Sequence, residues 1–289
     1  QHRARLDEQP TQVDPETLGG AARSLDEVLL TGRHGSAEWF KGAASPPRPT
    51  LRMPYLLAAA ATADGHAWAL SNAGLFSFSN ERWTREDAFP GKLDDRERLA
   101  LWASSPSDVW VVADGRAWRF DGKTWKAMTP ADVKVKHIWG RGPNDVYVFG
   151  SSVLRHWNGS KWEELAKLSL GLGGVAITGN ATKVWALTTS GDDVELQKGE
   201  LLVVEGGAVS RLPAPFWFKS IGFGGGVLWG AGGAVERLTD KGWERVDEVY
   251  ADDIVPTPQG VLLLNGSPTA REWNGQTFTV VRLPGEAVA

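Results

Sequence analysis

Apolar residues recur along this chain at a repeated set of unequal intervals. In the regular copies an apolar residue is followed eight positions later by a second, ten later by a third and five later by a fourth. The third anchor comes one residue early at Leu238 in one unit and is delayed to Val204 in another. The clearest copies are Trp102, Trp110, Phe120, Trp125 and Trp139, Tyr147, Trp157, Trp162. Alternate residues of a strand point to one face, so these intervals indicate four short strands per unit, joined by tight turns.

The second anchor of each unit marks seven copies of the pattern. They are Leu29, Trp68, Trp110, Tyr147, Trp185, Trp229 and Leu263, spaced 34 to 44 residues apart. This period is typical of the four-stranded blades of a β-propeller, in which neighbouring blades bury each other's apolar faces. We therefore predict an all-β protein with a single propeller of seven four-stranded blades over residues 17–285, preceded by a flexible tail over residues 1–16.

The number of blades depends on the N-terminal unit. Trp39 follows Leu29 at the expected ten-residue interval, but the first strand of this unit falls on small residues near 19–22. Its last strand is displaced beyond the proline-rich residues 45–49. The alternative is a propeller of six blades, with residues 1–53 as an arm or as an outer strand that closes the ring.

Turn-forming residues occupy the intervals between the anchors. Asp121-Gly122, Asn158-Gly159 and Asn274-Gly275 stand between third and fourth anchors, and these pairs tolerate the positive φ that tight hairpins require. Asp108 and Asp145 end the turn before the second strand of their units. We expect each of these two carboxylates to cap its turn, which is a structural role.

Two units carry a more detailed motif. They read Trp102-Ala-Ser-Ser-Pro-Ser-Asp-Val-Trp110 and Trp139-Gly-Arg-Gly-Pro-Asn-Asp-Val-Tyr147, followed by Trp118-Arg-Phe-Asp-Gly-Lys-Thr-Trp125 and His156-Trp-Asn-Gly-Ser-Lys-Trp162. They resemble the W-G-x-S-P-x-D-V-W-x-V-G … W-D-G-x-x-W repeats of secreted bacterial β-propeller proteins. These repeats are loosely similar to Asp-box (BNR-like) repeats and to the photosystem-assembly-factor propellers. The resemblance implies a non-enzymatic propeller, surface-exposed or periplasmic, whose motif residues are structural.

The composition excludes several classes of function. The chain has 31 Lys and Arg against 35 Asp and Glu, and the two signs are mixed, so a basic stripe for nucleic acid is missing from the sequence. It contains 0 Cys, which rules out disulfides and thiolate metal sites. No apolar run reaches the roughly 18 residues of a membrane helix. Because the sequence starts at Gln1, we expect a mature exported protein whose signal, with or without a lipid-bearing Cys, has been removed.

Candidate catalytic and metal-binding residues are scattered. A sialidase-like hydrolase would need a Tyr nucleophile, for which Tyr250 near Asp252 and Asp253 is the best placed. Asp252 and Asp253 could also face a calcium ion, but acidic residues in surface loops are more often simply solvated. We predict no catalytic residues, no metal site and no cofactor.

The connections between blades are the expected ligand-binding segments, because a propeller holds these loops rigidly. Phe216, Trp217 and Phe218 are consecutive and precede Lys219, and three successive aromatic residues cannot all enter one core. Arg98 ends a long charged connection over residues 85–98, and Tyr250 lies on another connection. Residues 188–199 form an acidic insertion that the repeat does not explain.

We predict that these six residues bind a protein partner: Phe216, Trp217, Phe218, Lys219, Arg98 and Tyr250. The predicted function is a non-catalytic interaction or assembly scaffold in the bacterial envelope or outside the cell. A carbohydrate-binding propeller is the alternative, in which aromatic residues on the connections stack on sugar rings, and a sialidase-like hydrolase is the third hypothesis.

Overall fold

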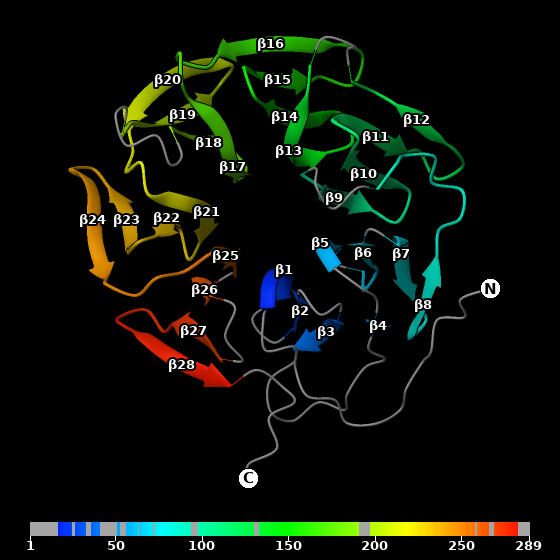
Figure 1. The fold of residues 1–289 in the computed structure, drawn as a ribbon, viewed down its shortest axis with the longest axis horizontal. Coiled ribbons are helices and arrows are strands. Elements are labelled where there is room, and N and C mark those ends of the chain that lie inside the picture. The colour runs from blue at the N-terminus through cyan, green and yellow to red at the C-terminus, as the bar shows by residue number, and fades with distance from the viewer. Residues whose placement is uncertain are drawn as a thin grey trace.

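The computed structural model describes residues 17–24, 27–32, 36–40, 51–52, 56–62, 64–71, 73–93, 98–129, 133–190, 197–257, 259–265 and 269–282. All regular elements in these ranges are β-strands. Strands form seven sheets of four, and each sheet is built from four consecutive strands in their chain order. The sheets are arranged around a common axis like the blades of a propeller (Figure 1).

The first four sheets contain strands β1 to β16. These are β1 (Thr17–Ser24), β2 (Glu27–Gly32), β3 (Ser36–Phe40), β4 (Leu51–Arg52); β5 (Leu56–Ala61), β6 (Ala67–Ser71), β7 (Gly74–Ser79), β8 (Arg82–Arg85); β9 (Ala100–Ser105), β10 (Asp108–Ala113), β11 (Arg116–Phe120), β12 (Trp125–Ala127); β13 (Val135–Gly142), β14 (Asp145–Gly150), β15 (Val153–Trp157), β16 (Trp162–Lys167).

The remaining three sheets contain strands β17 to β28. These are β17 (Gly173–Gly179), β18 (Lys183–Thr189), β19 (Gly199–Glu205), β20 (Ala208–Pro213); β21 (Phe218–Gly224), β22 (Val227–Gly232), β23 (Val235–Thr239), β24 (Gly242–Asp247); β25 (Asp253–Pro256), β26 (Val261–Leu264), β27 (Thr269–Trp273), β28 (Phe278–Arg282).

The ring closes by packing between sheets. The first strand of each sheet is the innermost, and each innermost strand contacts the next one round the axis. Strand β1 contacts both β5 and β25, so the sheet formed by residues 17–52 lies between the second sheet and the last one. No strand is exchanged between the first and last sheets among the described residues. The predicted all-β propeller is confirmed, whereas the proposed tail over residues 1–16 lies outside the described residues.

The second strands β6, β10, β14, β18, β22 and β26 form the core, as the anchor pattern predicts. All residues of β10 are buried, and so are the second anchors Trp68, Tyr147, Trp185, Trp229 and Leu263. Trp110 packs against Val135 and Ile138 of the following blade, which shows that its ring fills the space between two blades. Burying one such side chain removes roughly 150–250 Å² from water. Contacts between blades therefore supply the main cohesion of the ring.

Third and fourth anchors meet across the outer hairpin of several blades. Their ring centroids are 5.1 Å apart for Phe78 and Trp83, 5.3 Å for Phe120 and Trp125, 5.6 Å for Trp157 and Trp162 and 5.1 Å for Trp273 and Phe278. Each pair also lies directly opposite in the antiparallel register. The five-residue interval in the sequence is therefore a cross-strand aromatic contact, the kind that stabilises antiparallel pairs.

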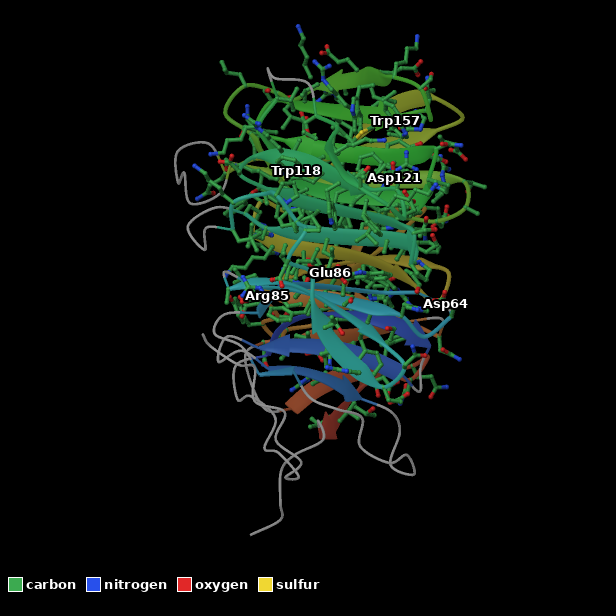
Figure 2. All side chains as sticks on the ribbon, turned by 90° about the vertical axis from the view of Figure 1, so that its right-hand side faces the viewer. Asp64, Arg85, Glu86, Trp118, Asp121 and Trp157 are labelled. Carbon is green, nitrogen blue, oxygen red and sulfur yellow. The ribbon has the colours of Figure 1, made fainter. Side chains whose placement is uncertain are left out.

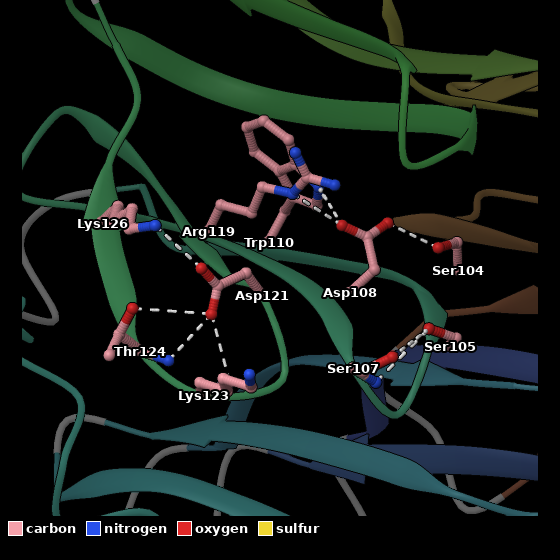
Figure 3. Close-up of polar contacts among 10 residues, drawn as sticks. All are labelled: Ser104, Ser105, Ser107, Asp108, Trp110, Arg119, Asp121, Lys123, Thr124 and Lys126. Atoms are coloured by element: carbon pink, nitrogen blue, oxygen red, sulfur yellow. Dashed lines mark hydrogen bonds and ion pairs between the residues drawn. The ribbon is translucent and has the colours of Figure 1, made fainter. Parts of the chain in front are cut away.

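The Asp108 carboxylate bonds to side chains from three strands. One carboxylate oxygen accepts a hydrogen bond from Ser104 Oγ at 2.5 Å (Figure 3). The other oxygen accepts from Trp110 Nε1 at 3.2 Å and from Arg119 Nε at 2.8 Å. This buried carboxylate thereby joins β9, β10 and β11. In the next blade Asp145 accepts from Arg141 and His156 in the same way.

The predicted hairpin turns have the expected geometry. Asp121 Oδ1 accepts hydrogen bonds from the backbone N–H groups of Lys123 and Thr124, at 3.1 and 2.9 Å, and Gly122 has φ +86° (Figure 3). The side-chain hydrogen bond from Lys126 is the main reason that the pKa of Asp121 lies below its usual range. Asn158 and Asn274 accept equivalent backbone bonds in their own turns.

Substitution of Trp162 tests the structural role of the anchors. Its ring packs edge-on against Trp110 at 6.0 Å, and its Nε1 donates to the Met128 carbonyl at 2.6 Å. We expect Trp162→Ala to lower the free energy of unfolding by about 2–4 kcal/mol. Trp162→Phe keeps an aromatic ring and should cost about 1–2 kcal/mol through the lost hydrogen bond. Urea denaturation measures both, and a Trp162→Ala curve identical to that of the parent would contradict this role.

Candidate functional site: the connection face

The ring has two faces with different loops. One face carries the connections that run from the outermost strand of a blade to the innermost strand of the next, and we call it the connection face. Figure 2 shows Arg85 and Glu86, which begin one connection, on the opposite side of the ring from Asp64 and Asp121. The last two residues belong to hairpin turns within blades. All six residues predicted to bind a partner lie on connections or on strands that start at the connection face.

The three consecutive aromatic residues divide between surface and core. Phe218 is the first residue of β21 and is buried, with its ring edge-on to Trp243 at 4.8 Å. A Cβ at position 230 would lie 2.2 Å from the Phe218 ring, so Gly230 provides the space that this ring needs. Phe216 is half-buried, and Trp217 remains 37% exposed. Phe218 is therefore a core residue, and Trp217 is the aromatic side chain that the loop presents.

Charged residues of the same blade hold Trp217 in place. The guanidinium carbon of Arg245 lies 5.9 Å from the centre of the Trp217 ring, a cation–π distance. Arg245 in turn forms ion pairs with the buried Glu236 at 3.3 Å and with Glu248 at 3.4 Å. The rings of Trp217 and Phe216 pack edge to face, with their centroids 5.1 Å apart. The exposed indole is thus supported on two sides by neighbouring side chains.

Tyr250 forms a second exposed aromatic group on the following connection. It is 43% exposed, and Lys219 Nζ lies 4.8 Å from the centre of its ring. Lys219 donates a hydrogen bond to the Tyr250 hydroxyl and forms an ion pair with Asp252 at 3.3 Å. The Tyr250 hydroxyl donates to Asp252. The hydrogen bond to Tyr250 is the main cause of the raised pKa of Lys219, which keeps this ammonium charged.

The two aromatic groups belong to one surface. Ala251 N donates to the Gly232 carbonyl at 3.1 Å, and a Cβ at position 232 would lie 2.0 Å from the Trp217 carbonyl oxygen. The loop of Trp217 and the loop of Tyr250 therefore both lie against Gly232. We call the surface formed by Phe216, Trp217, Lys219, Arg245 and Tyr250 the aromatic patch. The structure brings four of the six predicted residues together in it.

Arg98 is placed elsewhere. Its Nη2 donates to the carbonyl of Val175 in β17, at 3.5 Å, although Arg98 precedes β9. The charge of Arg98 also acts on His137 in β13 and on Asp253 in β25. All four of these strands are innermost strands, so Arg98 lies towards the axis, on the inner side of the connection face. It is not part of a rim around the aromatic patch.

Two titratable residues on innermost strands, Asp253 and His137, have shifted pKa values. Burial raises the pKa of Asp253 to about 6, although Ser220 Oγ and Ile254 N donate hydrogen bonds to its Oδ1 at 2.7 and 2.9 Å. Burial lowers the pKa of His137 to about 3, and the nearby charge of Arg98 adds to this effect. Asp252 and Asp253 are consecutive in the sequence, but their side chains bond to different residues. They therefore do not form an acidic pair.

The arrangement favours binding. Its chemistry consists of exposed aromatic rings and paired charges, which suit an interface. Within the described ranges, there is no group of three His, Cys, Asp or Glu side chains that could hold a metal ion. Across the same ranges, no helix is long and apolar enough to cross a membrane.

Comparison with known proteins identifies the fold. No known family model and no curated protein matches the chain. Among solved structures, YCF48 bound to a D1 peptide is 14% identical, with a TM-score of 0.61, and the match covers 91% of this chain and 94% of that one. A GH74 xyloglucanase from Xanthomonas campestris is 13% identical, with a TM-score of 0.72, over 98% of this chain and 56% of that one.

A third similar structure is an extracellular domain from B. thetaiotaomicron, described as part of a one-component system. It is 12% identical, with a TM-score of 0.64, and the match covers 90% of this chain but 39% of that domain. Similarity at these identities shows the β-propeller fold alone. The class of protein is therefore a β-propeller, and the finer Asp-box character of the repeats stays a prediction.

The pH dependence of stability tests the environment of Asp253. Between its unfolded pKa of about 4 and its folded pKa of about 6, the folded protein binds more protons at this site than the unfolded chain. Asp253 should therefore make the free energy of unfolding fall as pH rises through this window, by on the order of 3 kcal/mol. His137 acts in the opposite direction, since its pKa is lowered.

Comparison with Asp253→Asn separates the two effects, because His137 is present in both proteins. The stability of the parent minus that of Asp253→Asn should decrease between pH 4 and pH 6.5 and then stay constant. Chemical denaturation at several pH values measures this difference. A difference that does not change with pH would show that Asp253 titrates normally.

Proposed function

We propose that this propeller is a non-catalytic scaffold that binds a protein partner through the aromatic patch on its connection face. The observation that carries the proposal is the pair of exposed aromatic side chains, Trp217 and Tyr250, on two adjacent connections. Each ring is held by a cation that is itself paired with a carboxylate. Trp, Tyr and Arg are the residues that most often dominate the energy of protein interfaces.

The fixed conformation of the side chains in the aromatic patch also supports binding. Side chains that are already fixed by neighbours lose little conformational entropy when a partner binds. Arg245 and Lys219 are both engaged in ion pairs before any partner arrives, so the patch has little net charge to neutralise. This favours a partner that covers the two rings with apolar or aromatic groups and meets polar groups at the edge.

The fold neighbours are compatible with this function. One is a propeller bound to a D1 peptide, and another is an extracellular domain. We place the protein outside the cytoplasm, in the bacterial envelope or the extracellular space, in agreement with the secreted repeat proteins that its motifs resemble. The partner in this proposal is a protein of that compartment that belongs to a larger assembly.

Carbohydrate binding is the second candidate, and one observation favours it. The exposed rings of Trp217 and Tyr250 could stack on sugar rings, and the xyloglucanase shows that a similar fold can serve a polysaccharide-degrading enzyme. In this hypothesis the same two residues would be required, but the ligand would be a glycan.

A peptide-display library panned on the immobilised protein tests the proposal, with a glycan array run in parallel. We expect enriched peptides whose binding is weakened at least about tenfold by Trp217→Ala and by Tyr250→Ala. Leu170→Ala is the matched control, since Leu170 is 99% exposed on a different connection. Peptides that bind both patch variants as tightly as the parent would contradict the proposed surface. Binding to glycans alone, lost in the same variants, would replace the proposal by the second candidate.

A further inference from the structure

A small pocket lies at the second blade (β5 to β8), between the start of β7 and the connection that follows β8. It has a volume of about 210 Å³ and is lined by residues 73–75 and by residues of the segment 85–93. Arg85 and Glu86, which are labelled on the connection face in Figure 2, belong to this lining. Pockets for drug-sized ligands usually exceed about 300 Å³. This pocket therefore suits a group about as large as one amino acid side chain.

The fold holds the wall that carries Glu86. Glu86 N donates to the carbonyl oxygen of Leu75 in β7 at 2.9 Å, and Phe89 N donates to the Glu86 carbonyl at 3.2 Å. The Phe89 ring packs edge-on against Trp118 and Trp125 of the third blade, with centroids 6.1 and 4.9 Å apart. The connection is thus tied to the second blade by its backbone and to the third blade by an aromatic ring. The pocket is therefore formed before any ligand binds.

The charges that line the pocket do not balance. Arg85 Nε pairs with Asp87 Oδ1 at 3.1 Å, and both side chains are more than half exposed. Glu86 is half-buried, and its carboxylate has no ion pair or hydrogen bond with any other described residue. One cation and two anions give the lining a formal net charge of −1. A carboxylate that is partly removed from water is stabilised when a positive charge is added beside it.

An organic cation fits these residues better than a metal ion does. Ca²⁺ takes about six to eight oxygen ligands, and no group of three His, Cys, Asp or Glu side chains among the described residues could hold a metal. An ammonium group has three N–H donors and needs fewer acceptors. The exposed lining is mostly polar, which disfavours a purely apolar ligand. Leu75, Phe89 and Leu93 add a smaller apolar part, which an aliphatic chain can contact.

We propose that this pocket binds a primary ammonium group at the end of an aliphatic chain, with the Glu86 carboxylate as its ion-pair partner. A lysine side chain of a protein and a free alkylamine share this chemistry. When the ammonium group donates to Glu86, Asp87 stays paired with Arg85 and the lining becomes neutral. The aromatic patch lies at the sixth and seventh blades, so this site and the proposed function are tested independently.

A titration with N-acetyl-lysine methylamide, followed by NMR of the isotope-labelled protein, tests the site. We expect amide shifts over residues 73–75 and 86–93, with a Kd of about 0.1–10 mM for a ligand of this size. N-acetyl-norleucine methylamide has the same aliphatic chain without the ammonium group and should bind about three- to tenfold more weakly. Butylamine distinguishes the two sources of the cation. Equal affinity shows that the cation alone is recognised, and weaker binding of butylamine favours a lysine side chain of a protein.

Glu86→Gln removes the charge and keeps the size of the side chain. This variant should fold normally, because no described residue bonds to the Glu86 carboxylate, and it should bind the lysine derivative about three- to tenfold more weakly. Glu272→Gln is the matched control, since Glu272 is also half-buried but lies in β27, outside the pocket. Lys92→Ala should tighten binding, because it removes an exposed positive charge between two lining residues, Gly91 and Leu93.

Weaker binding by Glu86→Gln together with unchanged binding by Glu272→Gln supports the site. The proposal is overturned if the norleucine derivative binds as tightly as the lysine derivative, or if Glu86→Gln binds as tightly as the parent. Weaker binding by Lys92→Ala, or amide shifts confined to residues outside 73–93, would also overturn it.

Discussion

The burial of large side chains between neighbouring blades is the interaction on which the rest of this structure depends. A single four-stranded sheet here has apolar residues on both faces of its second strand, and each face is covered only when another blade packs against it. Trp110 lies on one such surface and Val111 on the other. Closing the ring removes these surfaces from water, because every blade then has a neighbour on each side.

The ring gives the connection face its properties. Strand ends are fixed by packing between blades, so the loops that join one blade to the next start from rigid positions. Trp217 and Tyr250 lie on two successive loops and share Gly232 as a common support. The Trp217 ring is exposed because the core position at this point is already filled by Phe218. The exposure of Trp217 in the aromatic patch is thus a consequence of a core that buries only Phe218 of the three consecutive aromatic residues.

Structural features that depend on a few neighbouring residues, such as strands and tight turns, could be predicted from the sequence. The anchor intervals indicate strands and tight turns because strand geometry is local, and the Asx turn at Asp121 follows from residues next to it. Contacts between distant segments were not predictable in the same way. The bond of Asp108 to Arg119 depends on how two strands align, and the position of Arg98 near the axis depends on the radius of the ring. For the same reason the sequence could not show that Asp252 and Asp253 point to different partners, or that Arg245 supports Trp217.

The central claim is that a rigid ring presents one binding surface formed by two adjacent connections. Hydrogen–deuterium exchange of the protein, alone and with a peptide selected from the display library, measures this claim most directly. We predict that the second strands of the blades exchange slowest in both states, and that the peptide adds protection over residues 214–219 and 248–252. Added protection at the hairpin turns around residues 64 and 121, with no change over those two segments, would contradict the account.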